Sequence, residues 1–203
     1  MRLSDRSPLA FGAYALAALL ALFELAVLWL ALNPDVPDEY QAYFIDRTTT
    51  CLPQEVTGEY ELGTEIDFRS GGPDTRELRP CGWDGPAGDG MHSIGETSRL
   101  RFAVSEPQPL ELMLELTGVT LPGPPTQTVV VSVNGMKVGE AEVTPDKTER
   151  FTFPVPEEAV EGSGFAEIVL DYPDAIMPGR RVANTYWRSV KLTAAALNPA
   201  GRP

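Results

Sequence analysis

The sequence is poor in the residue types on which most enzyme sites depend. Its 203 residues include one histidine, His92, and two cysteines, Cys51 and Cys81. It contains no P-loop, GxGxxG or CxxC motif, so no pattern in it points to nucleotide, dinucleotide or thiol redox chemistry. We therefore expect no catalytic residue, no cofactor and no metal site.

Positive charge is also scarce. The chain has 16 Lys and Arg against 29 Asp and Glu, a formal net charge of −13. Setting aside Arg2, Asp5, Arg6 and Glu24 leaves 14 basic and 27 acidic residues, which carry the whole net charge. This balance argues against nucleic acid as a partner and against docking on anionic lipid. With so many acids, a pair of carboxylates of the glycosidase kind is uninformative.

Long hydrophobic runs are absent except at one place. Residues 9–32 are apolar apart from Glu24. As a helix this run reaches about 36 Å, enough to cross the hydrocarbon core of a bilayer. A secretory signal would have a shorter apolar core and a small-residue cleavage site, which we do not find. The run therefore predicts an uncleaved single-span anchor in the lipid bilayer.

The flanks of this run predict its orientation. Arg2 and Arg6 precede it, whereas Asp35, Asp38 and Glu39 follow it. The positive-inside rule then places the N-terminus in the cytoplasm. A composition rich in Ala, Gly, Pro, Leu and Glu, without Asn-x-Ser/Thr, fits a bacterial inner-membrane protein that faces the periplasm. The expected division is a cytoplasmic N-terminus at 1–8, a transmembrane helix at 9–32, a periplasmic spacer at 33–50, a β-sandwich domain at 51–197 and a tail at 198–203.

One face of the predicted helix carries small residues and the single charge. The residues at this spacing of three and four are Ala13, Ala17, Ala21, Glu24 and Leu28. Small side chains let two membrane helices approach closely. A carboxylate at this depth costs about 2.5–3.5 kcal/mol, so Glu24 should be protonated, reach toward the interface or bond to a partner. The face predicts packing against another helix; the alternative is an alanine-rich anchor that tolerates one Glu.

The two cysteines predict a disulfide. Cys51 and Cys81 both follow the predicted span and form an even pair in an oxidising compartment. The bond would close a loop of about 30 residues and contribute roughly 3–4 kcal/mol in the chain-entropy model.

The external chain reads as all-β. Residues 51–98 alternate strand-like pieces, Val56–Leu62 and Glu65–Phe68, with loops, of which Gly82–Gly90 is the longest. Asn134-Gly135 between two apolar runs is a strong hairpin signal. The clearer strands lie at residues 100–104, 110–116, 128–133, 136–138, 150–155, 166–172 and 188–193. Short strands without helical periodicity predict an antiparallel two-sheet sandwich.

Part of this region resembles a known group of domains. The matching segments are GETSRLRF at 95–102, VVVSVNGMKVG at 129–139 and RSVKL at 188–192. They resemble the jelly-roll, carbohydrate-binding-like β-sandwich domains of bacterial membrane-anchored cell-envelope proteins, some of which stand next to sugar-handling enzymes. The resemblance covers about half of the chain and implies a jelly-roll-like fold without catalytic activity.

Three aromatic residues are candidates for a sugar platform. Trp83 lies in the Gly82–Gly90 loop, and Tyr186 and Trp187 lead into the last predicted strand. The alternative for each is a place in the core or at its rim.

Three polar residues have similarly open assignments. Asp84 and Asp89 could offer oxygens to Ca²⁺, but the EF-hand spacing is missing, and ordinary turn chemistry explains Asp and Gly in this loop. His92 could act as a base, although no nucleophile motif accompanies it and a surface position explains it equally.

Two functions from different classes follow. In the first, the chain is a non-catalytic accessory subunit of a larger integral-membrane complex of the respiratory or photosynthetic type, with its helix packed in the membrane and its sandwich bracing the periplasmic face. In the second, it is a membrane-anchored carbohydrate-binding module that serves cell-envelope polysaccharide. The small-residue face, Glu24 and the short spacer favour the first.

Overall fold

The computed structural model divides into two compact units, Met1–Gln41 and Ala42–Pro203. The residues that it describes are 8–45, 51–52, 54–120, 125–177 and 186–201.

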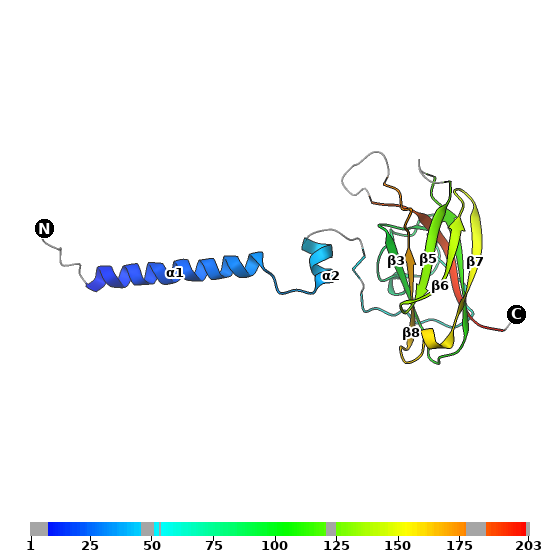
Figure 1. The fold of residues 1–203 in the computed structure, drawn as a ribbon, viewed down its shortest axis with the longest axis horizontal. Coiled ribbons are helices and arrows are strands. Elements are labelled where there is room, and N and C mark those ends of the chain that lie inside the picture. Colours follow the sequence, from blue (N-terminus) through cyan, green and yellow to red (C-terminus); the bar gives the residue numbers. More distant parts are fainter. Residues whose placement is uncertain (1–7, 46–50, 53, 121–124, 178–185, 202–203) are drawn as a thin grey trace. The chain divides into compact units, whose positions relative to one another are not determined.

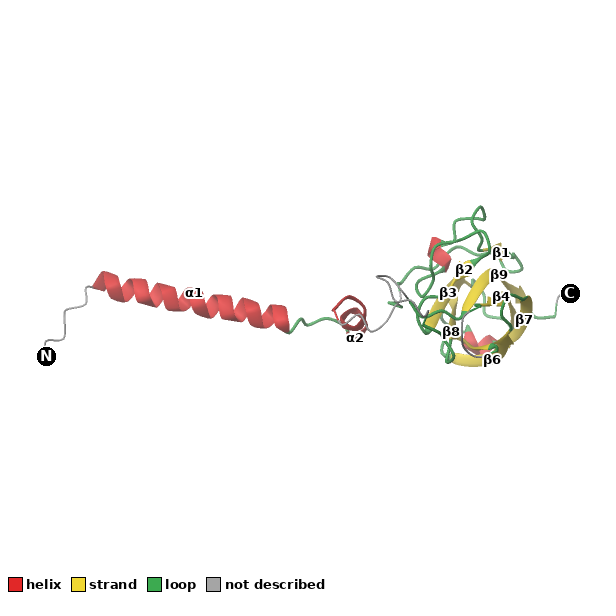
Figure 2. Ribbon diagram, turned by 90° about the horizontal axis from the view of Figure 1, so that it is seen from above, coloured by secondary structure: helices red, strands yellow, loops and turns green. Residues whose placement is uncertain are grey.

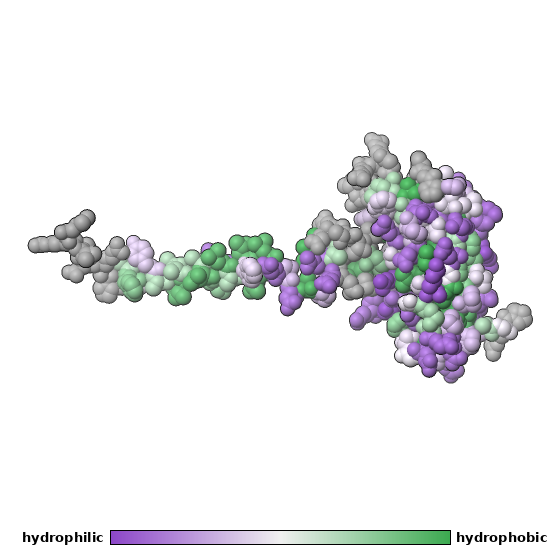
Figure 3. All heavy atoms as spheres, viewed as in Figure 1, coloured by the Kyte–Doolittle hydropathy of each residue, from purple (hydrophilic) through white to green (hydrophobic). Residues whose placement is uncertain are grey.

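The first unit is dominated by one helix, α1 (Pro8–Leu32). It ends where the Asn33 amide and side-chain Nδ2 both donate to the Trp29 carbonyl and Pro34 follows. The segment Ala10–Leu32 is long and apolar enough to cross a membrane, by length and composition. Figure 3 shows hydrophobic residues along this helix. The helix predicted at 9–32 is therefore present, and it could serve as a membrane anchor or as a signal sequence. Two short elements follow, α2 (Asp38–Tyr40) and the π-helical η1 (Gln41–Ile45).

The second unit is a sandwich of two antiparallel sheets. Strands β3 (Thr97–Ala103), β8 (Phe165–Asp171), β5 (Gln127–Val133) and β6 (Met136–Val143) form the first sheet in that order. The second sheet has the order β1 (Ile66–Asp67), β9 (Val190–Pro199), β4 (Leu110–Gly118) and β7 (Thr148–Val155), and β2 (Met91–His92) also pairs with β9. Figures 1 and 2 show the two layers from the side and along the strands. The fold class predicted from the sequence, a jelly-roll-like sandwich after one helix, is confirmed.

The core lies between the sheets and follows the alternation of the strands. On β5, Val129, Val131 and Val133 are fully buried, whereas Val130 and Ser132 are partly exposed. Burial thus alternates with a period of two along β5, as expected for a strand with one face in the core. Two single turns of 3₁₀-helix, η2 (Arg76–Leu78) and η3 (Glu157–Ala159), complete the unit.

Two segments differ from the sequence-based expectation. Strand β9 runs to Pro199, well past residue 193, and its Ala194–Ala196 stretch is buried. Alanine has a low strand propensity, but β9 is paired on both sides, so pairing and burial outweigh propensity. By contrast, Val56–Leu62 is not a strand: its described backbone makes a single bridge, from Gly58 to Phe102 of β3.

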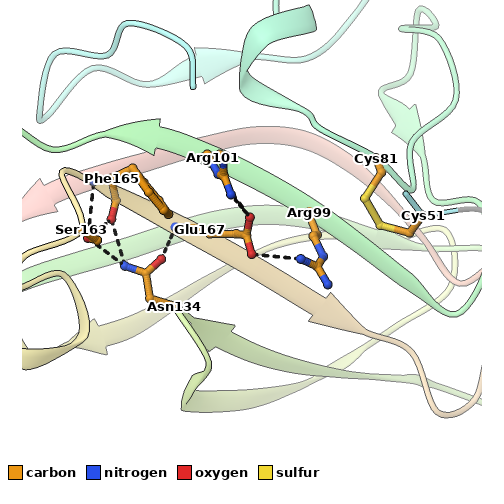
Figure 4. Close-up of polar contacts among 8 residues, drawn as sticks. All are labelled: Cys51, Cys81, Arg99, Arg101, Asn134, Ser163, Phe165 and Glu167. Atoms are coloured by element: carbon orange, nitrogen blue, oxygen red, sulfur yellow. Dashed lines mark hydrogen bonds and ion pairs between the residues drawn. A yellow bond between two sulfur atoms is a disulfide. The ribbon is translucent and has the colours of Figure 1, made fainter. Parts of the chain in front are cut away.

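The predicted hairpin joins β5 to β6. Asn134 and Gly135 have φ angles of 45° and 83°, the left-handed values that a two-residue hairpin turn requires. The Asn134 side chain also reaches β8 and the chain before it. Its Nδ2 donates to the Ala159 carbonyl at 2.8 Å. Figure 4 shows the same Nδ2 donating to the Phe165 carbonyl at 2.9 Å and the Oδ1 accepting from the Glu167 amide at 2.8 Å.

The predicted disulfide is present. Cys51 and Cys81 are bonded, with their Cα atoms 4.8 Å apart (Figure 4). The backbone of Cys81 bridges to Arg99 of β3. The bond thus ties Cys51, in the segment that precedes the strands, to Cys81 beside the edge of the first sheet.

Candidate functional site

A cleft of 480 Å³ lies at one end of the second sheet, where β2, the start of β9 and the end of β4 meet. We call it the end cleft. It is lined by Asp84, His92, Val119, Thr120, Asp146, Arg188 and Lys191.

Strand register places several of these residues together. His92 of β2 pairs with Lys191 of β9, so the two side chains lie on the same face. Gly118, at the end of β4, lies so close to the β6–β7 connection that an added Cβ would be 2.9 Å from the Pro145 nitrogen. This close approach brings Asp146 beside the end of β4, where its amide donates to the Gly118 carbonyl.

The Gly82–Gly90 loop contributes the acidic side of the site. Gly82 has a φ of 79°, and a Cβ there would be 2.3 Å from the Thr97 carbonyl oxygen, so only glycine fits. At the other end, paired backbone hydrogen bonds between Ala87 and Gly90 close a tight turn. These two constraints hold Asp84 near the base of the loop and Asp89 at its tip.

Arg188 and Asp84 form the first charge pair of the end cleft. Arg188 Nη2 lies 2.9 Å from Asp84 Oδ2, and its Nη1 donates to the Ser93 carbonyl at 3.0 Å. Buried Ser93 accepts the amides of Ser189 and Val190 through its Oγ, which fixes the chain on which Arg188 is carried. The Arg188 side chain is 20% exposed and that of Asp84 is 57% exposed.

Lys191 and Asp89 repeat the arrangement. Lys191 Nζ lies 2.9 Å from Asp89 Oδ2, and the side chains are 18% and 59% exposed. In both pairs the cation is therefore the more enclosed partner and the acid the more exposed one. The end cleft has a basic floor and an acidic rim.

The charge states follow from these contacts. Burial raises the pKa of Asp84, but hydrogen bonds from Arg188 and the Gly85 amide outweigh it, so the pKa lies below its ordinary value. The Lys191 ammonium lowers the pKa of Asp89. Burial, followed by the charge of Arg188, lowers the pKa of His92 below 6.5. At neutral pH both acids are ionised and His92 is uncharged.

The three aromatic candidates differ in how far they are buried. Trp83 is 8% exposed and donates its Nε1–H to the Arg99 carbonyl at 2.9 Å, so it belongs to the core, the alternative left open by the sequence. Tyr186 and Trp187 are 36% and 40% exposed, and Trp187 directly precedes Arg188 of the end cleft. A role of either in binding sugar stays a prediction.

The two aspartates of the Gly-rich loop, Asp84 and Asp89, bond to groups within the chain. Each is bonded to a cation, and Asp84 also accepts the following amide, that of Gly85, in ordinary turn chemistry. Among the residues that the structure describes, no group of three or more His, Cys, Asp or Glu side chains is placed to hold a metal ion.

The predicted helix-packing face lies on α1. Its members, Ala13, Ala17, Ala21, Glu24 and Leu28, are exposed in the single chain. Packing against another helix stays a prediction.

Sequence reasoning missed the residues that form the floor and part of the rim: Thr120, Asp146, Arg188 and Lys191. The spacing of the two cations gave no signal. Arg188 and Lys191 are three residues apart, which would place them on opposite faces of a regular strand, and Arg188 precedes β9.

Comparisons with known proteins show which solved structures the sandwich is similar to. No protein-family model matches the chain, and no curated protein matches it. Among solved structures, it is similar to a CBM36 carbohydrate-binding module in complex with calcium and xylotriose, at 12% identity and a TM-score of 0.39, covering 66% of this chain and 99% of that one. A family 6 carbohydrate-binding module gives 9% identity, a TM-score of 0.40 and coverage of 72% and 100%.

An enzyme is also among these structures. A ruminal GH26 endo-beta-1,4-mannanase gives 12% identity and a TM-score of 0.41, and the match covers 72% of this chain but 28% of the mannanase. The predicted resemblance to carbohydrate-binding-like sandwiches is confirmed by these neighbours. At such low TM-scores they carry no argument about the ligand or the activity of this chain.

Proposed function

We propose that this protein is a membrane-anchored, non-catalytic carbohydrate-binding module, with the end cleft as its sugar site. It is the second of the two functions that the sequence predicts. The observation that carries the proposal is the fixed set of hydrogen-bonding groups in the end cleft. Sugar hydroxyls both donate and accept hydrogen bonds, so they need donors and acceptors side by side.

The end cleft meets this requirement. Asp84 offers exposed acceptors, while Arg188, next to it, offers donors held in place by Ser93. Lys191 and Asp89 repeat the pair. Groups already held by mutual bonds lose little conformational entropy when a ligand binds.

The protonation states support binding rather than hydrolysis. Glycosidases of the usual kind need one carboxylic acid that stays protonated, which requires a raised pKa. Asp84 and Asp89 have lowered pKa values instead. Neither is suited to protonate a leaving group.

The remaining features support an anchored protein outside the cytoplasm. The Ala10–Leu32 segment has the length and apolarity of a membrane span. Arg2 and Arg6 before it, acids after it, and the Cys51–Cys81 disulfide support an oxidising, periplasmic location for the sandwich. The accessory-subunit function is favoured by the small-residue face of α1 with Glu24, which is exposed in the single chain, and by the short spacer.

The test is glycan binding by the full chain in detergent micelles, measured by affinity electrophoresis through gels that contain neutral polysaccharides. We expect retardation in at least one gel, lost in Arg188→Ala. Gln108→Ala, at another surface of the sandwich, is the matched control and should leave retardation unchanged. Retardation is measured against a gel without polysaccharide. The proposal is removed if wild type is retarded in no gel, or if Arg188→Ala is retarded as strongly as wild type.

A further inference from the structure

Both cations on the floor of the end cleft are neutralised by acids from one loop. Asp84 and Asp89, which pair with Arg188 and Lys191, both come from Gly82–Gly90. Asp146 adds a further acid to the lining, without an ion pair to any residue of the described ranges. With His92 uncharged, the two acids of the lining, Asp84 and Asp146, equal its two bases in number. Asp89, which is bonded to Lys191 from outside the lining, adds a third acid, in a chain whose net charge is −13.

We infer that the Gly82–Gly90 loop makes the end cleft selective for uncharged sugars, with Asp84 as the main residue that excludes anionic ones and Asp89 as the second. This inference rests on the proposed function and names its ligand class. A sugar carboxylate would seek the Arg188 guanidinium, the most favourable partner in the cleft for a planar carboxylate. Asp84 already occupies Nη2 of that guanidinium.

Three further hydrogen bonds hold Asp84 in place. Its amide donates to the His92 carbonyl at 2.9 Å, and its own carbonyl accepts from Arg79 Nη1 at 3.1 Å. Its Oδ1 accepts from the Gly85 amide at 2.9 Å. An incoming carboxylate would therefore meet a fixed like charge, which is costly in a partly enclosed site.

A neutral sugar meets the opposite situation. Each carboxylate oxygen has two lone pairs, so Asp84 can accept a sugar hydroxyl and keep its bond to Arg188. The 57% exposure of the Asp84 side chain leaves room for that contact. The same residue thus favours a hydroxyl group and opposes a carboxylate.

The test uses matched pairs of oligosaccharides with the same backbone. The probes are neutral β-1,4- and α-1,4-gluco-oligosaccharides and their C6-oxidised, carboxylate-bearing counterparts, titrated into the full chain in neutral detergent by calorimetry at pH 7.5. We expect wild type to bind the neutral member about tenfold or more tightly than the oxidised one. In Asp84→Asn, which keeps the Oδ1 acceptor for Gly85, this ratio should fall by about tenfold.

Two further variants make the result specific. Asp89→Asn removes the ion-pair partner of Lys191 in the same cleft and should also lower the ratio of neutral to oxidised affinity. It therefore tests the inference even where Asp84→Asn does not fold. Glu140→Gln removes one negative charge from an exposed pair with Lys137 on β6, outside the cleft lining, and should leave the ratio unchanged.

The outcomes separate the two proposals. Wild type that binds the oxidised member as tightly as the neutral one overturns this inference and leaves the proposed function standing. An equal change of the ratio in Glu140→Gln and Asp84→Asn also overturns it, because the effect would then be one of net charge. Absence of binding by every variant to every probe removes the proposed function and this inference together.

Discussion

Asn134 connects three segments of the sandwich through one side chain. Its Nδ2 donates to the carbonyls of Ala159 and Phe165, and its Oδ1 accepts from the Glu167 amide. Asn134→Asp would turn that donor into a charged acceptor that faces two carbonyl oxygens. We expect a loss of about 2–4 kcal/mol in the free energy of unfolding, measured by urea titration of the full chain in micelles.

Asn134→Gly is the control for this prediction. Glycine keeps the left-handed φ of the turn and removes the same hydrogen bonds without adding charge. We expect a smaller loss, about 1–2 kcal/mol. If the Asp variant is no less stable than the Gly variant, the side-chain bonds of Asn134 do not have the role assigned to them.

The same residues show what a sequence can predict at this scale. The Asn134-Gly135 turn and the buried Val131 are visible from local signals, a turn dipeptide and an alternation of period two. The Arg188–Asp84 pair is not visible, because its partners are 104 residues apart in sequence and meet only through the pairing of β2 with β9. The candidate site therefore could not be predicted, although its charged loop could be noticed.

At the scale of elements, the disulfide joins an irregular segment to the sheet. Residues 51–65 contain no strand among those described. They are attached by the Cys51–Cys81 bond, by the Gly58–Phe102 bridge and by hydrogen bonds of Tyr60 and Gly63 to Leu197 of β9. We expect the double variant Cys51→Ser/Cys81→Ser to lose about 3–4 kcal/mol in the free energy of unfolding. Urea titration of the wild type with and without reductant should show the same difference.

Thiol labelling provides the independent check on this bond. Protein from the cell envelope should take up no alkylating agent until it is reduced. Full alkylation of Cys51 and Cys81 without reductant would contradict the disulfide and weaken the periplasmic assignment.

His92, on the short strand β2, should make the stability of the folded chain depend on pH. Burial and Arg188 lower the pKa of this imidazole in the folded state below 6.5. Below that pH the unfolded chain binds the proton more readily than the folded one, so stability falls as pH falls from about 7 to 5. We expect His92→Gln to show a smaller decrease of the thermal midpoint over this range.

The acids of the neighbouring loop give the internal control. Asp84 and Asp89 have lowered pKa values, so their contribution is present at neutral pH and is lost only at about pH 4 and below, as they become protonated. That lower transition should persist in His92→Gln. Identical pH profiles of wild type and variant between pH 7 and 5 would show that the imidazole is not buried as described.

Elements also differ in how far the sequence predicts them. The helix α1 and the strands with alternating patterns were expected within a few residues of their observed bounds. The buried alanines of β9, Ala194–Ala196, give no strand signal, because their conformation is set by pairing with β4 on one side and, for Ala194 and Ala195, with β1 on the other. Such a segment depends on tertiary pairing, which a single sequence does not contain.

At the scale of the whole molecule, the chain joins an apolar helix to an acidic sandwich. The proposed function treats α1 as a tether, whereas the accessory-subunit function requires its Ala13, Ala17, Ala21 and Glu24 face to pack against another helix. These two requirements respond differently to enlargement of that face. Ala17→Leu/Ala21→Leu keeps hydrophobicity and helix propensity, so insertion should survive, while close approach of a second helix is blocked.

We expect the Ala17→Leu/Ala21→Leu protein to resist alkaline extraction from membranes, to migrate like wild type in native gels in mild detergent, and to bind glycans unchanged. Leu19→Ala/Leu22→Ala, on the opposite face, is the matched control and should behave in the same way. If wild type and Leu19→Ala/Leu22→Ala both comigrate with a larger complex and Ala17→Leu/Ala21→Leu alone does not, the helix is a packing surface. The accessory-subunit function would then apply to the helix, and glycan binding by the end cleft would have to be tested within that complex.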